Sequence, residues 1–391
     1  MSSKIELSKD QSEAFDDISE WYVYHQRDVP FLTMGGYAGT GKTTLMSYLY
    51  SKFNQSTIAY CAYTGKAASV LRSKLGERDN NIESNASVST IHSLIYKPKL
   101  DAHGRVIDWV RKSNVDADLI VVDEASMVGQ SVHEDLLSYG VPVLYVGDHG
   151  QLPPVTEGFN LMDQPMIRLE TPHRFSENLP LIQLSMMARI DGKIPYGDYG
   201  DRIKKVSKRE IVANNGPVDR LVKSKSMLDG SSVIICGFNK TRIKLNSRIR
   251  DYNDFFEHTP MIGDRVICLK NNKKSNVPLY NGSHGTVRHI DKRNKYDYAN
   301  AVIEMDGVSD DMFRGKITYD GFTQEKVDAW SMPQGREVFD YGYVITAHKS
   351  QGSEFERVMV IEEGRNIWQE NWNRWLYTAV TRSQSELLIV G

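Results

Sequence analysis

The stretch GYAGTGKT at Gly36–Thr43 decides the fold of this chain. It matches the pattern GxxxxGK(S/T), and it lies between an apolar run that includes Leu32 and the helical pattern LMSYLY. A strand, a glycine-rich loop and a helix in this order form a P-loop, whose backbone amides surround phosphate groups while the lysine reaches the β and γ oxygens. We therefore predict an ATP site here. The residues predicted to contact the nucleotide are Gly36, Ala38, Gly39, Thr40, Gly41, Lys42, Thr43 and Thr44.

A second stretch, VVDEAS at Val121–Ser126, contains the acidic groups that ATP hydrolysis requires. The apolar run Leu119–Val122 is typical of a buried parallel strand, and it places Asp123 and Glu124 at the carboxyl end of that strand. We predict that Asp123 binds Mg²⁺ together with Thr43, and that Glu124 polarises the attacking water as the general base. The two stretches together predict a nucleotide-hydrolysing site with ATP and Mg²⁺ as its cofactors.

Apolar runs that alternate with helical patterns predict an α/β protein with parallel sheets. FLTMGG, TIAYCAY, LIVVDE and VPVLYVGD precede residue 170, and VIICGF, RVICLK, YVITAH and ELLIVG follow it. Segment 96–115 is typical of a short hairpin, and segment 261–336, with NG, HG and DG turns, is typical of a small antiparallel barrel. We expect a first domain at 1–95 and 116–172 and a second at 173–260 and 337–391.

The composition favours a soluble protein of the cytoplasm. No apolar run approaches the roughly 18 residues of a membrane span, and the start MSSKIELSKDQ is too polar for a signal peptide. Cys61, Cys236 and Cys268 lie in apolar runs without a CxxC pair, so we expect reduced core thiols. The formal net charge of −2 gives no overall basic character, so any nucleic-acid contact has to come from a local groove.

Further motifs follow along the chain. They are CAYTGKAASVL (Cys61–Leu71), STIHSLIY (Ser89–Tyr96), VGDHGQLPPV (Val146–Val155), TPHRF (Thr171–Phe175), YVITAHKSQGSEF (Tyr343–Phe355) and LYTAVTRSQ (Leu376–Gln384). In this order, the motifs resemble those of superfamily I helicases, and within them the 5′→3′ subclass that holds the RecD-like and phage Dda-type enzymes. The resemblance covers nearly the whole chain. It implies two RecA-like P-loop domains, with the hairpin as a pin in the first and an SH3-like barrel inserted in the second.

The resemblance also implies an activity and further residues of the ATP site. The activity is ATP-driven 5′→3′ translocation on single-stranded DNA with unwinding of the duplex, in replication, recombination or repair. Gln151 resembles the family's glutamine that couples to the γ-phosphate or the attacking water. Arg382 and Arg174 resemble two arginines that neutralise the transferring phosphate, a role that suits the planar, always charged guanidinium. Gln11, in LSKDQSEAF, resembles the residue that reads the adenine edge. The catalytic set is then Lys42, Glu124, Gln151, Arg174 and Arg382.

The residues that match the family's DNA-contacting segments follow strands of both domains. Hydroxyls, amides and a few cations suit phosphate contacts that do not depend on base sequence. They are Thr64, Gly65, Lys66, Thr90 and His92 in the first domain, and Thr346, His348, Lys349 and Gln351 in the second. Trp109, in the pin, either caps an opened base pair or packs within its segment. The expected partners are single-stranded DNA, its junctions with duplex DNA, and single-strand-binding or replisome proteins. We expect a monomer, in the host cytoplasm if the gene is a phage gene.

Three other classes of protein share some of these features. A GTPase switch carries NKxD, but NKTR at Asn239–Arg242 lacks the aspartate. A nucleic-acid-binding protein with an inactive ATP site is disfavoured because the P-loop lysine and both acidic residues are present. A single-stranded DNA translocase that displaces bound proteins with little unwinding has the same motifs, and it stays open as an alternative.

Overall fold

The structure is a computed structural model that describes most of the chain. The described residues are 6–53, 55–76, 86–100, 106–154, 158–171, 179–209, 222–272, 275–291, 297–306, 312–323, 327–329, 332 and 335–391. The chain divides into two compact units, one formed by Met1–Lys99 and Asp108–Leu179, the other by Leu100–Ile107 and Pro180–Gly391. Within the described parts, no helix combines the length and the apolar character needed to cross a membrane.

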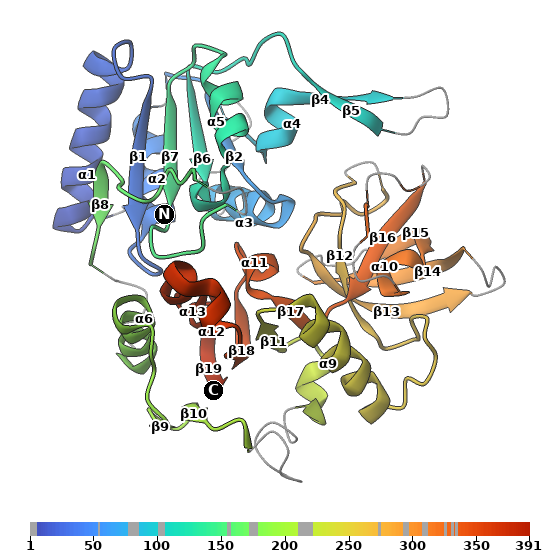
Figure 1. Cartoon of the computed structure of the whole chain (residues 1–391). Helices are drawn as coiled ribbons and strands as arrows, with labels where there is room; N and C mark the ends of the chain where they lie inside the picture. Colours follow the sequence, from blue (N-terminus) through green and yellow to red (C-terminus); the bar gives the residue numbers. More distant parts are fainter. Residues whose placement is uncertain are drawn as a thin grey trace. The chain divides into compact units, whose positions relative to one another are not determined.

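The first unit is built on a six-stranded parallel sheet with the strand order β3-β2-β6-β7-β1-β8 (Figure 1). Its strands are β1 (Phe31–Gly36), β2 (Ile58–Ala62), β3 (Ala86–Thr90), β6 (Leu119–Asp123), β7 (Val143–Gly147) and β8 (Ile167–Leu169). Its helices are α1 (Lys9–Glu20), α2 (Lys42–Lys52), α3 (Gly65–Gly76), α4 (Ile91–Ile95) and α5 (Gln130–Leu137), with short turns η1 (Trp21–His25) and η2 (Ala125–Met127). The expected parallel α/β architecture is confirmed.

The side chains of this sheet alternate between two apolar cores. In β6, Leu119 and Val121 belong to one core, while Ile120 and Val122 belong to the other. Because both faces of a parallel sheet are covered, its strands are apolar at every position, which is why they read as continuous runs in the sequence. All strands of the sheet end at one edge, so the loops after β1, β6 and β7 converge there.

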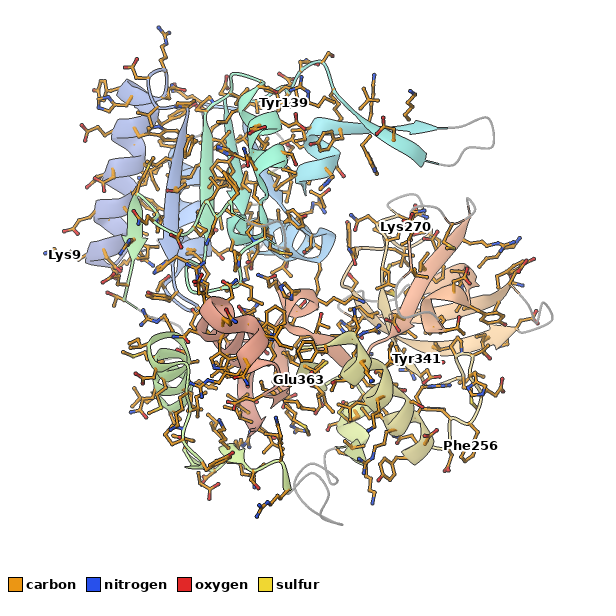
Figure 2. The ribbon with its side chains drawn as sticks, in the orientation of Figure 1. Lys9, Tyr139, Phe256, Lys270, Tyr341 and Glu363 are labelled. Carbon is orange, nitrogen blue, oxygen red and sulfur yellow. The ribbon has the colours of Figure 1, made fainter. Side chains whose placement is uncertain are left out.

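A two-stranded sheet of β4 (Tyr96–Leu100) and β5 (Val106–Arg111) interrupts the first unit, as the sequence predicts. Figure 1 shows this hairpin projecting away from the sheet. Tyr139, labelled in Figure 2, anchors its base, since the hydroxyl lies 2.8 Å from the carbonyl oxygen of Ile95 and 3.0 Å from that of Lys112. The hairpin is therefore tied at both ends to the segment that follows α5.

The second unit contains another six-stranded sheet, with the order β17-β11-β18-β19-β10-β9. Its strands are β9 (Gly197–Asp198), β10 (Ile203–Val206), β11 (Ser232–Cys236), β17 (Val344–Thr346), β18 (Phe355–Ile361) and β19 (Ser383–Val390). Its helices and turns are α6 (Leu179–Asp191), η3 (Lys225–Met227), α9 (Asn239–Tyr252), α11 (Ala347–Ser350), α12 (Arg365–Trp368), η4 (Gln369–Asn371) and α13 (Trp372–Val380). All pairs are parallel except β9 with β10 at the edge.

A closed five-stranded barrel is inserted between β11 and β17. Its strands are β12 (Arg265–Cys268), β13 (His284–Asp291), β14 (Tyr298–Met305), β15 (Phe313–Thr318) and β16 (Arg336–Tyr341), and it carries α10 (Asp320–Thr323). The antiparallel expectation was wrong for one pair, because β15 and β16 run parallel. Parallel neighbours need a crossover, which the long connection through α10 provides. The fifth strand, β16, begins at Arg336 and ends at Tyr341, so the barrel extends five residues past the end that the sequence pattern gave it.

Three cysteines lie in these cores, and all three are buried with free thiols. Cys61 belongs to the first unit, Cys236 to the sheet of the second, and Cys268 to the barrel. The prediction of reduced core cysteines is confirmed.

Candidate nucleotide and nucleic-acid sites

The P-loop between β1 and α2 has the backbone that its glycines predict. Gly39 and Gly41 have φ angles of 83° and 80°, in the left-handed region that favours glycine, and α2 begins directly after Gly41. A Cβ at Gly36 would lie 2.6 Å from Oγ1 of Thr40, so this position also requires glycine. The loop thus leads the chain tightly into the N-terminus of α2, where free backbone amides attract anions.

Lys42 and Gln11 both contact the P-loop backbone. Nζ of Lys42 donates to the carbonyl oxygens of Gly36, at 2.7 Å, and Tyr37, at 3.1 Å. Nε2 of the buried Gln11 donates to the carbonyl oxygen of Thr40 at 3.1 Å, and its Oε1 accepts from the amide of Ser8 in a capping box. Gln11 thus links the start of α1 to the loop, while its contact with adenine stays a prediction.

Asp123 is the last residue of β6, and Glu124 follows it directly. In the sheet β6 pairs with β7, which in turn pairs with β1, the strand that leads into the P-loop. Burial raises the pKa of Asp123, while the Glu124 amide, which donates to Oδ1 at 2.9 Å, and the charge of Lys42 oppose that rise. Glu124 has a φ of 54°, an uncommon value for a residue other than glycine, and such strain concentrates at functional sites.

The donor set at this edge fits Mg²⁺. The Thr43 hydroxyl and the Asp123 carboxylate are hard oxygen ligands, and Mg²⁺ usually takes one or two carboxylates together with nucleotide phosphates rather than a cage of protein groups. The described residues hold no group of three or more His, Cys, Asp or Glu side chains placed to bind a metal alone.

Gln151 lies after β7 on the same edge and is almost fully buried, at 5% exposure. Its Nε2 donates to Oδ2 of Asp148 at 3.3 Å, whereas its buried Oε1 has no hydrogen-bond partner among the described residues. An unpaired buried oxygen is costly, so it is expected where a ligand or water supplies the missing donor. Sequence reasoning missed the orienting role of Asp148, although its place at the end of the LYVGD strand was the available signal.

Arg382 lies between α13 and β19 and is only 4% exposed. Its guanidinium donates to the carbonyl oxygens of Thr378 and Ser353 and to the hydroxyl of Thr381. All these acceptors are neutral, and in the described part of the chain no carboxylate pairs with it. A buried cation of this kind is suited to an anionic ligand. Arg174 lies outside the described residues.

The predicted DNA-contacting residues of the first unit follow β2 and β3. Thr64 accepts from the Ala67 amide at 3.2 Å at the start of α3, whose first residues are Gly65 and Lys66. Thr90 caps α4 by accepting from the Ser93 amide at 3.2 Å.

His92, in α4, stands among aromatic rings. Its centroid lies 6.1 Å from that of Tyr63 and 6.5 Å from that of Trp109, and burial lowers the pKa of the imidazole. Trp109 is half-buried, so it takes part in packing, and its capping of an opened base pair stays a prediction.

The second unit repeats this arrangement after its own edge strand. Thr346 caps α11 by accepting from the Lys349 amide, and His348 follows two residues later, as His92 follows Thr90. Nζ of Lys349 lies 3.7 Å from Oδ2 of Asp340, and Gln351 is buried at the end of α11. The structure thus brings each set of predicted DNA residues together within its own unit.

Two family models match the chain. The model described as AAA domain matches residues 6–212, more than half of the chain, and the model described as UvrD-like helicase C-terminal domain matches residues 341–390.

Several proteins are similar along most of this chain. The ATP-dependent RecD2 DNA helicase of Deinococcus radiodurans is 26% identical over 409 residues, covering 98% of this chain and 49% of that protein. The RecBCD enzyme subunit RecD of Mycobacterium tuberculosis is 24% identical over 410 residues, covering 91% of this chain and 66% of that protein. The chain therefore spans about half of the first relative's length and about two thirds of the second's.

Solved structures share the fold. Pif1 of Bacteroides bound to single-stranded DNA superposes with a TM-score of 0.59 at 17% identity, covering 99% of this chain and 92% of that one. Pif1 helicase of Candida albicans gives a TM-score of 0.57 at 18% identity, covering 99% and 95%. At this level of identity the similarity concerns the fold alone.

Proposed function

Since the chain belongs to the superfamily I helicases of the RecD/Pif1-like 5′→3′ family, we propose that it is an ATP-dependent DNA helicase. In this proposal it moves 5′→3′ along single-stranded DNA and unwinds the duplex, in replication, recombination or repair. The alternative from the sequence, a translocase that displaces bound proteins with little unwinding, uses the same residues.

One observation carries the proposal. The P-loop, the acidic pair and Gln151 come from three neighbouring strands, β1, β6 and β7, and meet at one edge of the first sheet. That edge offers a cation, two carboxylates and an amide oxygen that lacks a donor among the described residues. Phosphoryl transfer needs little more than positioned charge and an oriented water, which these groups supply.

Each group has a separate role in hydrolysis. Lys42 and the P-loop amides bind the β and γ phosphates, Glu124 accepts the proton of the attacking water, and Gln151 orients that water. Thr43 and Asp123 would hold Mg²⁺, which neutralises charge on the phosphates. Arg382 and Arg174 neutralise the charge that develops on the transferring phosphate.

The proposal extends to the surroundings of the enzyme. The predicted DNA-contacting residues hold the phosphates of single-stranded DNA, and the pin meets the junction with the duplex. The protein acts as a monomer in the cytoplasm, alongside single-strand-binding or replisome proteins. We also propose the two RecA-like domains and the SH3-like insertion with the bounds that the sequence predicts, except that β16 (Arg336–Tyr341) belongs to the barrel.

The decisive experiment compares Lys42→Ala with the wild type and with Lys52→Ala, which changes an exposed lysine at the far end of the same helix. ATP hydrolysis with and without single-stranded DNA is measured, then strand displacement on duplexes with a 5′ or a 3′ tail. We expect stimulation by DNA, unwinding of the 5′-tailed duplex only, and near-complete loss of both activities in Lys42→Ala alone. Wild-type turnover in that variant refutes the ATP site, and unwinding from the 3′ tail alone refutes the polarity.

A second substrate separates the two versions of the function. A single strand that carries a tightly bound protein near its 3′ end reports displacement without unwinding. Protein displacement without strand separation on the tailed duplex would favour the translocase.

A further inference from the structure

Three aromatic rings gather at the carboxyl edge of the second sheet. Phe238 and Trp368 are stacked, with ring centroids 6.3 Å apart and planes inclined by 15°, and His348 lies 5.5 Å from Trp368. All three side chains are half-buried, so each keeps part of its surface in solvent. They follow β11, β18 and β17, which are neighbours in the sheet, so the cluster arises where three parallel strands end together.

The backbone around the rings is fixed by Glu363, which is labelled in Figure 2. Its Oε1 accepts from the amides of Gly237, at 2.8 Å, and Phe238, at 3.0 Å, and its Oε2 accepts from the hydroxyl of Thr241 at 2.7 Å. One carboxylate therefore ties the loop that carries Phe238 to the segment that leads into Trp368. Such a clamp reduces the conformational entropy that the loop itself would lose when a ligand binds the rings.

Gly364 provides the room for the stack. A Cβ at this position would lie 2.5 Å from the ring of Phe238 and 2.8 Å from Nε1 of Trp368, and the residue has a φ of 80°. Glycine is thus required for both space and backbone conformation, since only a residue without a side chain allows the two rings to meet.

The first unit has a comparable arrangement around His92. There the edge strand β3 leads into Thr90 and His92, and the neighbouring strand β2 ends before Tyr63, whose ring contacts His92. In the second unit the edge strand β17 leads into the equivalent threonine and His348. The ring that contacts His348 is Trp368, which follows β18.

The charges around the rings favour an anionic polymer. Lys240 and Arg365 are exposed on the two segments that carry Phe238 and Trp368. Lys349, which follows His348, pairs with Asp340, and the carboxylate of Glu363 is taken up by the donors of its own loop. Burial lowers the pKa of His348, which keeps the imidazole neutral and able to stack at neutral pH. Cations beside aromatic faces form the combination by which proteins hold single strands without reading their sequence.

From this cluster we infer that Phe238, His348 and Trp368 form a base-stacking platform for single-stranded nucleic acid. The ligand class is a nucleobase attached to a phosphate backbone that the flanking cations contact. This inference rests on the proposed function, but it adds a base contact that is separate from the phosphate contacts already assigned.

The test separates base contacts from phosphate contacts. The wild type, Trp368→Ala and Trp368→Leu are titrated, without ATP, with a fluorescently labelled thymidine oligonucleotide and with an abasic oligonucleotide of the same length and charge. Stacking on one aromatic side chain contributes about 1–3 kcal/mol per base, so both variants should bind the thymidine strand about 5- to 150-fold more weakly. Their affinity for the abasic strand should change less than twofold. Trp368→Leu keeps apolar volume, which protects the test if the alanine variant folds poorly.

Ile367→Ala provides the matched control, because Ile367 precedes Trp368 and is 71% exposed without belonging to the ring cluster. We expect wild-type affinity for both oligonucleotides. The platform is refuted if the Trp368 variants lose affinity equally for the thymidine and the abasic strands, or if Trp368→Leu loses no affinity for the thymidine strand. Either result would leave the proposed helicase function unaffected. Failure of the wild type to bind either strand contradicts the proposed function itself.

Discussion

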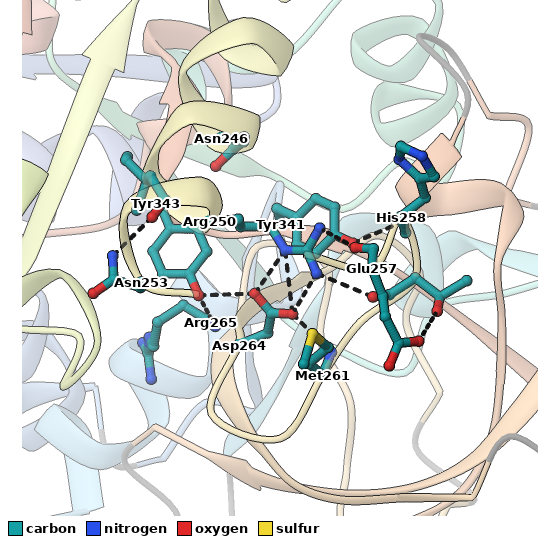
Figure 3. Close-up of polar contacts among 12 residues, drawn as sticks. Asn246, Arg250, Asn253, Glu257, His258, Met261, Asp264, Arg265, Tyr341 and Tyr343 are labelled. Carbon is teal, nitrogen blue, oxygen red and sulfur yellow. Dashed lines mark hydrogen bonds and ion pairs between the residues drawn. The ribbon is translucent and has the colours of Figure 1, made fainter. Parts of the chain in front are cut away.

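The substitution Asp264→Asn tests a buried ion pair that joins α9 to the barrel. Asp264 is fully buried, and Arg250 of α9 donates to its two oxygens at 3.0 Å and 3.1 Å (Figure 3). The same guanidinium donates to the carbonyl oxygens of Glu257, at 2.7 Å, and Thr259, at 3.0 Å, and lies 4.2 Å from the ring centroid of Tyr341. The pair therefore holds the loop between α9 and β12 as well as the base of the barrel.

The expected loss of stability follows from what the asparagine leaves behind. Asp264 also accepts from the hydroxyl of Tyr343 at 2.9 Å and from the Met261 amide at 2.7 Å, so an amide group turns one acceptor into a donor that faces other donors. Breaking a buried pair from one side costs about 3–5 kcal/mol, because the remaining charge stays buried and unpaired. For a unit of this size we expect the melting temperature to fall by about 6–20 °C.

The assay combines thermal unfolding with hydrogen exchange of peptides from β12 and β16, which assigns the loss to the barrel. Glu304→Gln is the matched control, because its partner Arg288 is 51% exposed and Glu304 is 45% exposed in the same barrel. An exposed pair contributes about 1 kcal/mol or less. If Asp264→Asn changes stability no more than Glu304→Gln does, the reasoning about burial is refuted.

Three further outcomes follow from the site and the histidines. Gly41→Ala places a side chain at a φ of 80°, which costs about 1–2 kcal/mol. We expect the free variant loop to relax from this conformation, so that ATP has to restore it and ATP affinity measured by titration falls about 5- to 30-fold; unchanged affinity would contradict this reasoning. Gln151→Ala should lower the kcat of DNA-stimulated hydrolysis about 100-fold with less effect on nucleotide affinity, and loss of affinity alone would assign Gln151 to binding instead. Burial lowers the pKa of His92, His133 and His348, so the unfolded chain binds more protons below about pH 6.5 and stability falls as the pH drops through that range. Urea unfolding at pH 7.5 and 5.5 checks this, and an equal or higher midpoint at pH 5.5 would contradict it.

Local patterns were enough for the two parallel sheets and for the backbone of the P-loop. Gly39 and Gly41 are needed wherever the backbone turns through the left-handed region, and Asp123 follows an apolar run that has to be a buried strand. The glycine-rich loop and the buried strand each depend on residues that are adjacent in the chain, so the order of amino acids alone predicts both. The parallel pairing of β15 with β16 was missed because strand direction inside a barrel depends on how the chain returns, which no short pattern records.

The amino-acid order by itself determined the P-loop, the acidic strand end and the alternation of strands and helices, since each requires only neighbouring residues. Tertiary structure alone decided which distant side chains meet. Glu363 bonds the amide of Gly237 across 126 positions, Trp368 stacks on Phe238, and Arg250 pairs with Asp264 inside the base of the barrel. A polar or aromatic side chain is stabilised by the partner that folding brings next to it. That partner is determined by strand order and packing rather than by spacing along the chain.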